Sequence, residues 1–281
     1  MKKDGAILLL GAVFLLLLVS VLTGSAKQYP IHDSYFATPE ISDHAFEQVK
    51  EAKPITDVKG ILVNHHLLAA KLIAQEFLQA SETDPEVVVV FSPNHFTRGD
   101  GRIIISNADW NTPYGTLKGA HSFIEKIADA QVVSIDELPF DKEHGVSGII
   151  PFVKKVFPNT KVIPVIFKDS AKQDEVRTFV DTLIDTLPKK TLFVCSFDFS
   201  HDSTVSIANE RDAVSKPILE GNQLGKVADV AVDSKPGLYA CMYAMSKLGA
   251  AFHLDENTNS SVLTGNPSQP DVTSYFVGHY K

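Results

Sequence analysis

The chain has 281 residues, of which 44% are hydrophobic and 21% charged, a composition typical of a globular protein and not of a disordered or fibrous one. It carries 26 Lys and Arg against 34 Asp and Glu, so the formal net charge is −8. An acidic chain without a clustered basic run is not expected to bind nucleic acid. The two cysteines, Cys195 and Cys241, exclude a scaffold held by several disulfides but allow one bridge.

The first residues have the order of a targeting segment. Lys2 and Lys3 precede an apolar run from Ala6 to Leu22, and small residues follow at 23–26. A charged, then apolar, then small-residue order is typical of a secretory signal, and a run of about 17 residues is near the lower limit for a membrane span. We therefore expect residues 1–26 to be a signal peptide or an N-terminal membrane anchor. Residues 27–281 would then form an extracytoplasmic domain that meets the membrane only through this segment.

Beyond residue 26, apolar runs alternate with segments of helical periodicity. In chain order the pattern predicts a strand at 60–64, a helix at 66–80, strands at 87–91 and 103–105, a helix at 121–130, a strand at 131–135, a helix at 144–157, a strand at 161–167, a helix at 174–187, a strand at 191–197, helices at 206–219 and 238–248, and a strand at 274–279. This alternation predicts a single α/β domain with a mainly parallel β-sheet flanked by helices. Residues 255–270, rich in Asn, Ser, Thr, Gly and Pro, are predicted to be a surface loop.

Polar side chains follow three of these predicted strands. His65 comes directly after the strand at 60–64, and His95 lies four residues after Phe91. Asp198 follows the strand at 191–197, with His201 three residues further on. Ligands of open α/β sheets bind beyond the carboxyl ends of the strands, so we expect these side chains to converge. Imidazole nitrogen and carboxylate oxygen together suit iron or zinc, and the sequence therefore predicts a metal site at this edge.

Each of these residues also has a purely structural interpretation. Asp198 or Ser200 could cap a helix and leave His201 exposed. His66 cannot point into the same site as His65 from a regular element, since adjacent side chains diverge. Cys195 lies inside a strand run and is expected in the core, and a helical Cys241 is typically a small buried apolar residue. The convergence of several strand ends, and no single residue, supports the metal site.

Four short segments carry a family resemblance. Ser196–His201 reads S-F-D-F-S-H, and segments 61–67, 92–96 and 274–278 read I-L-V-N-H-H-L, S-P-N-H-F and S-Y-F-V-G. They are similar to the motifs S-S-D-F-x-H, I-I-A-P-H-A-G, G-P-S-H-H and S-Y-x-x-G of the Memo family, which includes AmmeMemoRadiSam system protein B. The resemblance extends over most of the chain, from about Gly60 to Tyr280.

The resemblance to the Memo family implies a fold similar to that of class III extradiol dioxygenases and an iron site, with copper and zinc as alternative metals. It implies that the metal ligands are His65, His95 and Cys241. Asp198 and His201 would be catalytic, with His201 as a proton donor or acceptor. The further residues expected to line the pocket are His66, Asn94, Glu143 and His144. For Glu143 and His144, charge complementarity at a helix start is an alternative role.

The sequence also departs from the family motifs. Asn64 and Leu67 stand where the motif has Pro and Gly, and Phe96 replaces the second His of G-P-S-H-H. Several polar pocket groups are thus replaced, whereas the ligand residues implied by the resemblance are retained. In an exported protein Cys195 and Cys241 could also form a disulfide, which would remove the Cys241 thiolate.

Three functions fit these observations. The first is an oxidoreductase-like redox metalloprotein that uses iron or copper at His65, His95 and Cys241. The second is a non-catalytic protein at the cell surface that binds metal or a partner, and the third is a zinc-dependent hydrolase on the same pocket. In each case the expected partner is a small molecule or another protein.

Overall fold

The structure of the chain is a computed structural model that describes residues 27–281. The predicted leader at residues 1–26 lies outside the described residues. Within residues 27–281, no helix has both the length and the apolar character that a bilayer span requires.

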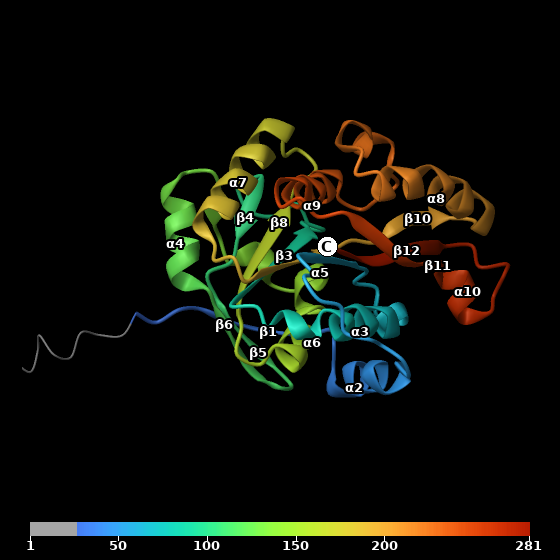
Figure 1. The fold of residues 1–281 in the computed structure, drawn as a ribbon, viewed down its shortest axis with the longest axis horizontal. Coiled ribbons are helices and arrows are strands. Elements are labelled where there is room, and N and C mark those ends of the chain that lie inside the picture. The colour runs from blue at the N-terminus through green and yellow to red at the C-terminus, as the bar shows by residue number, and fades with distance from the viewer. Residues whose placement is uncertain (1–26) are drawn as a thin grey trace, which may run out of the picture.

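One mixed, mostly parallel sheet of twelve strands runs through the described chain (Figure 1). The strands are β1 (Ile31–Asp33), β2 (Gly60–Val63), β3 (Val87–Pro93), β4 (Ile103–Ile105), β5 (Asp109–Thr112), β6 (Gly115–Gly119), β7 (Ser134–Ile135), β8 (Lys161–Phe167), β9 (Thr191–Ser196), β10 (Phe199–Ser203), β11 (Phe252–Asn259) and β12 (Val272–Tyr280). Their order is β1-β5-β6-β8-β3-β9-β2-β12-β10, with β11 paired to β12 and β4 to β8 and β7.

Helices cover both faces of this sheet. They are α2 (Pro39–Gln48), α3 (Ala70–Gln79), α4 (His121–Asp129), α5 (His144–Ser147), α6 (Ile150–Val156), α7 (Gln173–Thr186), α8 (Val205–Glu220), α9 (Lys235–Lys247) and α10 (Ser260–Thr264). In Figure 1, α7 and α9 lie above the sheet, α4 lies at its left, and α2, α3 and α6 lie below it. The predicted α/β class, a mostly parallel sheet flanked by helices, is therefore confirmed.

The central strands are apolar on both faces because each face packs against a helical layer. In β3, Val87, Val89 and Phe91 belong to the core cluster under α4, α7 and α9. Val88 and Val90 point the other way, into the cluster with α3 and α6. Successive side chains of a strand alternate between faces, so the continuous apolar run of β3 is what a strand covered on both sides requires.

The parallel centre of the sheet brings three strand ends to one edge. β3 pairs in parallel with β8 and β9, and β9 pairs in parallel with β2. The carboxyl ends of β2, β3 and β9 therefore lie side by side, and the segments that follow them carry His65, His95 and Asp198. This is the arrangement that the sequence predicts for the candidate metal site.

The helix predicted at 144–157 is divided in two. Helix α5 ends at Ser147, and α6 begins at Ile150 with Pro151 in its first turn. Proline has no backbone N–H to donate to the preceding turn, so a continuous helix cannot run through Pro151 without losing a hydrogen bond. A short, separate α5 is what places Glu143 and His144 at a helix start beside the strand ends.

The prediction of a surface loop at 255–270 is wrong, because this segment contains the end of β11 and all of α10. Polar residues of β11 pair with β12 in an antiparallel ladder from Phe252 to Asn259. Asn259 then caps α10 by accepting a hydrogen bond from the Val262 N–H at 3.0 Å. The sequence analysis did not predict β1, α2 or the β5–β6 hairpin, and the strand predicted at 131–135 is confined to Ser134–Ile135.

Candidate metal centre

His65 follows β2 and is held by hydrogen bonds at both its backbone and its ring. The His65 N–H donates to Oδ1 of Asp198 at 3.2 Å, and His65 Nδ1 lies 3.1 Å from Oγ of Ser196. The Ser196 hydroxyl donates its own proton to the carbonyl of Gly145 at 2.7 Å. Since that proton is already used, Ser196 Oγ accepts from Nδ1–H, and Nε2 of His65 is left unprotonated. An unprotonated Nε2 is the form of imidazole that binds a metal.

His95 follows β3 and is oriented by Glu143 in the same way. Oε1 of Glu143 lies 2.6 Å from Nδ1 of His95, and Oε2 accepts from the His95 backbone N–H at 3.0 Å. Glu143 is fully buried at the start of α5, where it also accepts from the Gly145 N–H at 3.1 Å. A carboxylate acceptor fixes the proton on Nδ1 and directs Nε2 of His95 to the centre. Carboxylate–histidine pairs of this kind support metal ligands.

Two buried carboxylates, Asp198 and Asp233, face these ring nitrogens. Oδ2 of Asp233 lies 3.4 Å from His65 Nε2 and 4.0 Å from His95 Nε2. Oδ2 of Asp198 lies 3.5 Å from His65 Nε2. The segments that carry these two residues are joined by a pair of hydrogen bonds. The Asp198 N–H donates to Asp233 Oδ2 at 2.9 Å, and the Asp233 N–H donates to the Asp198 carbonyl at 3.0 Å. The other carboxylate oxygen of Asp233, Oδ1, is buried and has no hydrogen-bond partner within the described part of the chain.

His144 adds a third ring to this site. It stacks on His95 with ring centroids 3.8 Å apart, whereas His65 meets His95 edge-on at 5.0 Å. Two triads offer ligand atoms that all lie within 4.8 Å of one another: His65, His95 and His144, and His65, Asp198 and Asp233. Each triad contains His65, so His65 lies at the centre of the candidate ligand set.

The electrostatics of the site favour a cation. Burial, followed by the neighbouring His95 and His144, lowers the pKa of His65 well below its ordinary value, so the ring is neutral. Burial raises the pKa of Asp198, and burial together with the Asp198 charge raises the pKa of Asp233 well above its ordinary value. Adjacent buried carboxylates repel each other, and a bound cation would relieve that repulsion. The neutral imidazole of His65 and the unpartnered oxygen of Asp233 therefore fit a metal ion.

Gly145 provides the space in which the rings pack. A Cβ at this position would overlap Oγ of Ser92 and would lie 3.3 Å from both Nδ1 of His65 and Cε1 of His95. A larger residue would therefore push against both candidate ligands. Glycine is the usual residue where the backbone comes this close to a functional site, because it has no Cβ.

The other predicted site residues differ in their burial and in their hydrogen bonds. His201 has a buried Nε2 without a hydrogen-bond partner, and its neighbours Ser200 and Asp202 have φ angles of 28° and 49°. Positive φ values at non-glycine residues are uncommon and gather at functional sites. His66 is exposed, with Nδ1 2.7 Å from the Tyr275 hydroxyl. Asn94 is not brought into the cluster, since its amide bonds the backbone of Arg98 at 2.8 and 3.1 Å.

Cys241 is not a metal ligand in this structure, which corrects the prediction made from the resemblance. Cys241, on α9, forms a disulfide with Cys195, on β9, and both are fully buried with their Cα atoms 6.1 Å apart. Ser196 faces His65, so its neighbour Cys195 points to the opposite face of the sheet, toward α9. A disulfide sulfur has no thiolate to offer a metal. The structure thus contains the Cys195–Cys241 disulfide, which the sequence analysis had kept as an alternative to a Cys241 thiolate.

Asp233 is the site residue that the sequence analysis missed. It lies just before Ser234, which caps α9 by accepting from the Gly237 N–H at 3.2 Å. An Asp before a capped helix start is a common pattern, so this position carried no distinguishing signal. Its position beside the histidines depends on a loop returning to the strand edge, which only the three-dimensional structure shows.

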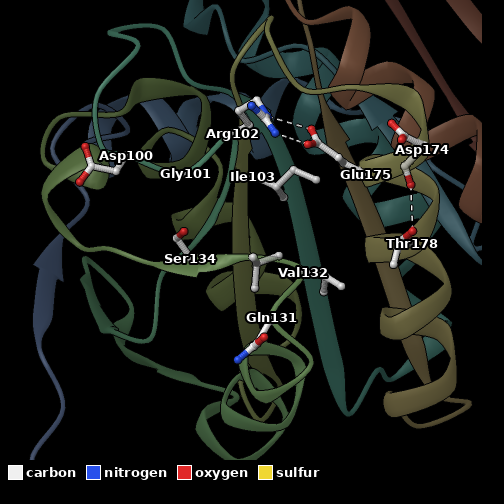
Figure 2. Close-up of a pocket in the computed structure, with 11 residues that line it drawn as sticks. Asp100, Gly101, Arg102, Ile103, Gln131, Val132, Ser134, Asp174, Glu175 and Thr178 are labelled. Atoms are coloured by element: carbon white, nitrogen blue, oxygen red, sulfur yellow. Dashed lines mark hydrogen bonds and ion pairs between the residues drawn. The ribbon is translucent and has the colours of Figure 1, made fainter.

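A separate pocket of about 490 Å³ contains none of the predicted site residues (Figure 2). Two of its lining residues, Arg102 and Glu175, point toward each other in Figure 2, with Arg102 Nε donating to Glu175 Oε2 at 2.9 Å. The guanidinium and the carboxylate thus neutralise each other. The histidines and aspartates of the predicted site therefore converge at the strand ends and not in this pocket.

Comparisons with known proteins agree with the motifs. The chain is 26% identical over 243 residues to a MEMO1 family protein of Methanocaldococcus jannaschii, covering 80% of this chain and 77% of the relative. It is 22% identical over 245 residues to one of Caldivirga maquilingensis, covering 85% of each chain. A crystal structure of an uncharacterized protein from Escherichia coli K12 aligns with a TM-score of 0.49 and 13% identity, covering 77% of this chain and 99% of that one. Residues 33–269 match the sequence profile of the Memo-like protein family, and the chain therefore belongs to the Memo family.

Proposed function

We propose that this Memo protein is an iron-dependent oxidoreductase that holds its metal through His65, His95 and Asp233 and acts on a small molecule. One observation carries the proposal. Nδ1 of His65 is hydrogen-bonded to Ser196, and Nδ1 of His95 is hydrogen-bonded to Glu143. The Nε2 atoms of His65 and His95 therefore both face the same oxygen, Asp233 Oδ2, at 3.4 and 4.0 Å. Ring nitrogens fixed in this way are a general feature of metal-binding histidines.

The donor set favours iron among the candidate metals. Two imidazoles and one carboxylate form the ligand set typical of non-haem iron oxygenases. The copper site with two histidines and Cys241, which the sequence analysis considered, needs a thiolate. With Cys241 in a disulfide, nitrogen and oxygen donors remain, which favours iron over copper. When bound, iron would supply redox chemistry with open coordination positions.

The remaining residues have roles that do not depend on the metal. Asp198 accepts from the backbone N–H groups of His65 and His66, at 3.2 and 3.5 Å, and so fixes the turn after β2. Burial lowers the pKa of His201, so its ring is neutral and its unpartnered Nε2 can accept a proton from a substrate. His144, on the more exposed side of the cluster, borders the route by which a small molecule would enter.

A zinc-dependent hydrolase is the second candidate function. It is favoured by the triad of His65, His95 and His144, because three imidazoles with an open position are a ligand set of catalytic zinc. The two candidates use the same histidines and differ in the metal and in the need for oxygen.

An extracytoplasmic location is part of the proposal. The buried Cys195–Cys241 disulfide supports it, because disulfides persist in oxidising compartments and are rare in the reducing cytosol. The apolar run that precedes the described residues supports it as well.

The test is metal analysis and oxygen uptake with the full-length chain. Protein purified without added metal is expected to carry iron, and protein loaded anaerobically with iron is expected to consume oxygen when a suitable small molecule is supplied. His95→Ala is expected to lose both properties, whereas His44→Ala, which removes an exposed imidazole on α2, keeps them. Zinc with hydrolysis in the absence of oxygen would favour the second candidate. Binding of neither metal would contradict both.

A further inference from the structure

A second cluster of metal-ligating side chains lies away from the His65 centre. It consists of Glu76 on α3, Asp255 on β11 and His279 on β12. His279 pairs with Ile61 near the start of β2, whereas His65 follows the end of that strand. The two clusters therefore lie at opposite ends of β2 and share no residue.

Glu76 is the unusual member of this second cluster. It is 0% exposed, on the face of α3 that packs into the core beside Ile73 and Phe77. Neither of its carboxylate oxygens has a hydrogen-bond partner among residues 27–281. Burying a carboxylate without a partner is costly, and such groups are normally paired or bound to a cation. The two unpartnered oxygens of Glu76 thus point to a ligand.

Asp255 and His279 reach the same point from the sheet. The ladder between β11 and β12 shifts register between Leu254 and Glu256, so Asp255 is the extra residue of a β-bulge. Bulges redirect side chains. Here Oδ2 of Asp255 lies 2.7 Å from Nδ1 of His279, whose side chain is 7% exposed. Asp255 retains 23% exposure, which leaves a path from solvent to the cluster.

We propose that Glu76, Asp255 and His279 form a second cation site, which takes a divalent transition metal of the Zn²⁺ class. Each residue offers one ligand atom, and these atoms all lie within 4.8 Å of one another. One imidazole nitrogen and two carboxylate oxygens are donors that zinc accepts, with water completing the coordination from the exposed side.

A cation here would join three elements that are far apart in the sequence. It would link α3 to both strands of the β11–β12 ladder at the end of the chain. Strand β12 also carries Tyr275, whose hydroxyl contacts His66 beside the first centre. We expect the second site to be structural, because its cation would hold the last strand against α3 and would add stability to the folded state.

The competing explanation is a proton shared between the two carboxyl groups. Burial, followed by the charge of Asp255, raises the pKa of Glu76 well above its ordinary value, and a neutral Glu76 could hydrogen-bond to Asp255. In that case zinc would have no effect on the protein, and Glu76→Gln would keep the fold unchanged. The two explanations therefore predict different responses to zinc.

The test uses the full-length chain with His65→Ala and His95→Ala, so that the first centre does not dominate the measurement. After treatment with a chelator, Zn²⁺ is titrated by calorimetry and the Tm is measured with and without Zn²⁺. We expect one tightly bound equivalent and a higher Tm with zinc. Adding Glu76→Gln or Asp255→Asn is expected to weaken that binding beyond the roughly 10–100-fold that loss of an outer partner costs, and to abolish the Tm shift.

Two features keep this test decisive. Asp255 is partly exposed on a bulge, so Asp255→Asn tests the site even if a change at the buried Glu76 disturbs folding. Glu256→Gln removes a neighbouring charge without removing a proposed ligand, and it is expected to keep both the bound equivalent and the Tm shift. Unchanged zinc binding in the Glu76→Gln and Asp255→Asn variants, equal loss in Glu256→Gln, or no zinc binding in the starting variant would overturn the proposal.

Discussion

Asp233 Oδ2 lies 3.4 Å from Nε2 of His65, and both side chains are buried beneath the edge where β2, β3 and β9 end. The same oxygen accepts the backbone N–H of Asp198, so its position is set by the chain and not by the histidine alone. A carboxylate in this position would complete the proposed ligand set of two imidazoles and one oxygen. Asp233 therefore replaces Cys241 as the third candidate ligand.

Asp233→Asn is expected to weaken iron binding by more than about tenfold, because it removes the ligand charge. Its stability without metal is expected to be unchanged or higher, because the pKa of Asp233 is raised by burial and by Asp198, and the ionised form therefore costs stability. Calorimetric titration and denaturant unfolding of the chelated protein measure the two effects. Asp229→Asn, at an exposed position, should change neither. A destabilised variant with full metal affinity would show that Asp233 is structural.

Gly145→Ala tests how tightly the two rings are packed. The added methyl would meet Ser92 Oγ and approach both His65 and His95, so we expect a loss of about 1–3 kcal/mol in unfolding free energy together with weaker metal binding. Gly225→Ala is the matched control, because a Cβ there meets no atom within 4 Å. Chemical denaturation of both variants compares them directly. Equal stability of the two would mean that the site is more open than the structure shows.

Cysteine variants separate a structural disulfide from a thiolate ligand. The bridge closes a loop with a sequence separation of 46, and losing it is expected to cost about 2–5 kcal/mol in either Cys195→Ala or Cys241→Ala. Both variants should bind metal as the parent does. Thiol counting of the unfolded parent without reductant should find no free thiol. Loss of metal in Cys241→Ala alone, with metal retained in Cys195→Ala, would restore the thiolate assignment.

Asp212 gives a prediction about pH. It is 6% exposed and accepts hydrogen bonds from Asn257, Ser200 and Ser274, yet burial raises its pKa above the ordinary value. With a raised pKa in the folded state, the unfolded chain ionises first as pH rises. The contribution of Asp212 to stability is therefore full below about pH 4 and is lost as pH rises through the folded-state pKa.

Asp212→Asn removes this titration. The unfolding free energy of the parent relative to the variant is thus expected to fall between acidic and neutral pH. Denaturant unfolding of both proteins across this range measures the difference. A relative stability of the parent that rises with pH would mean that the three hydrogen bonds outweigh burial.

The sequence predicted the parts of the fold and site that depend on local pattern. The apolar runs of β2, β3 and β9 predicted a parallel centre, and the positions just after them predicted His65, His95 and Asp198 as neighbours. These predictions succeed because the edge at which parallel strands end is fixed by topology.

The rest of the site depends on contacts between distant segments. Asp233 lies in a loop whose return to the strand edge has no local signal. The end of β11, from Asp255 to Asn259, was predicted as a loop because its polar residues have low strand propensity, and only pairing with β12 makes them a strand. The pairing of Cys195 with Cys241 follows from the packing of α9 on the sheet, which the spacing of two cysteines cannot show.

X-ray absorption at the iron edge of the full-length chain, loaded anaerobically with iron, tests the proposed ligand set most directly. We predict nitrogen and oxygen neighbours with the multiple-scattering pattern of two imidazoles and no sulfur neighbour, and loss of this signal in His95→Ala. A sulfur neighbour in the coordination shell would contradict the replacement of Cys241 by Asp233. An iron spectrum unchanged by His95→Ala would contradict the location of the metal at the ends of β2 and β3.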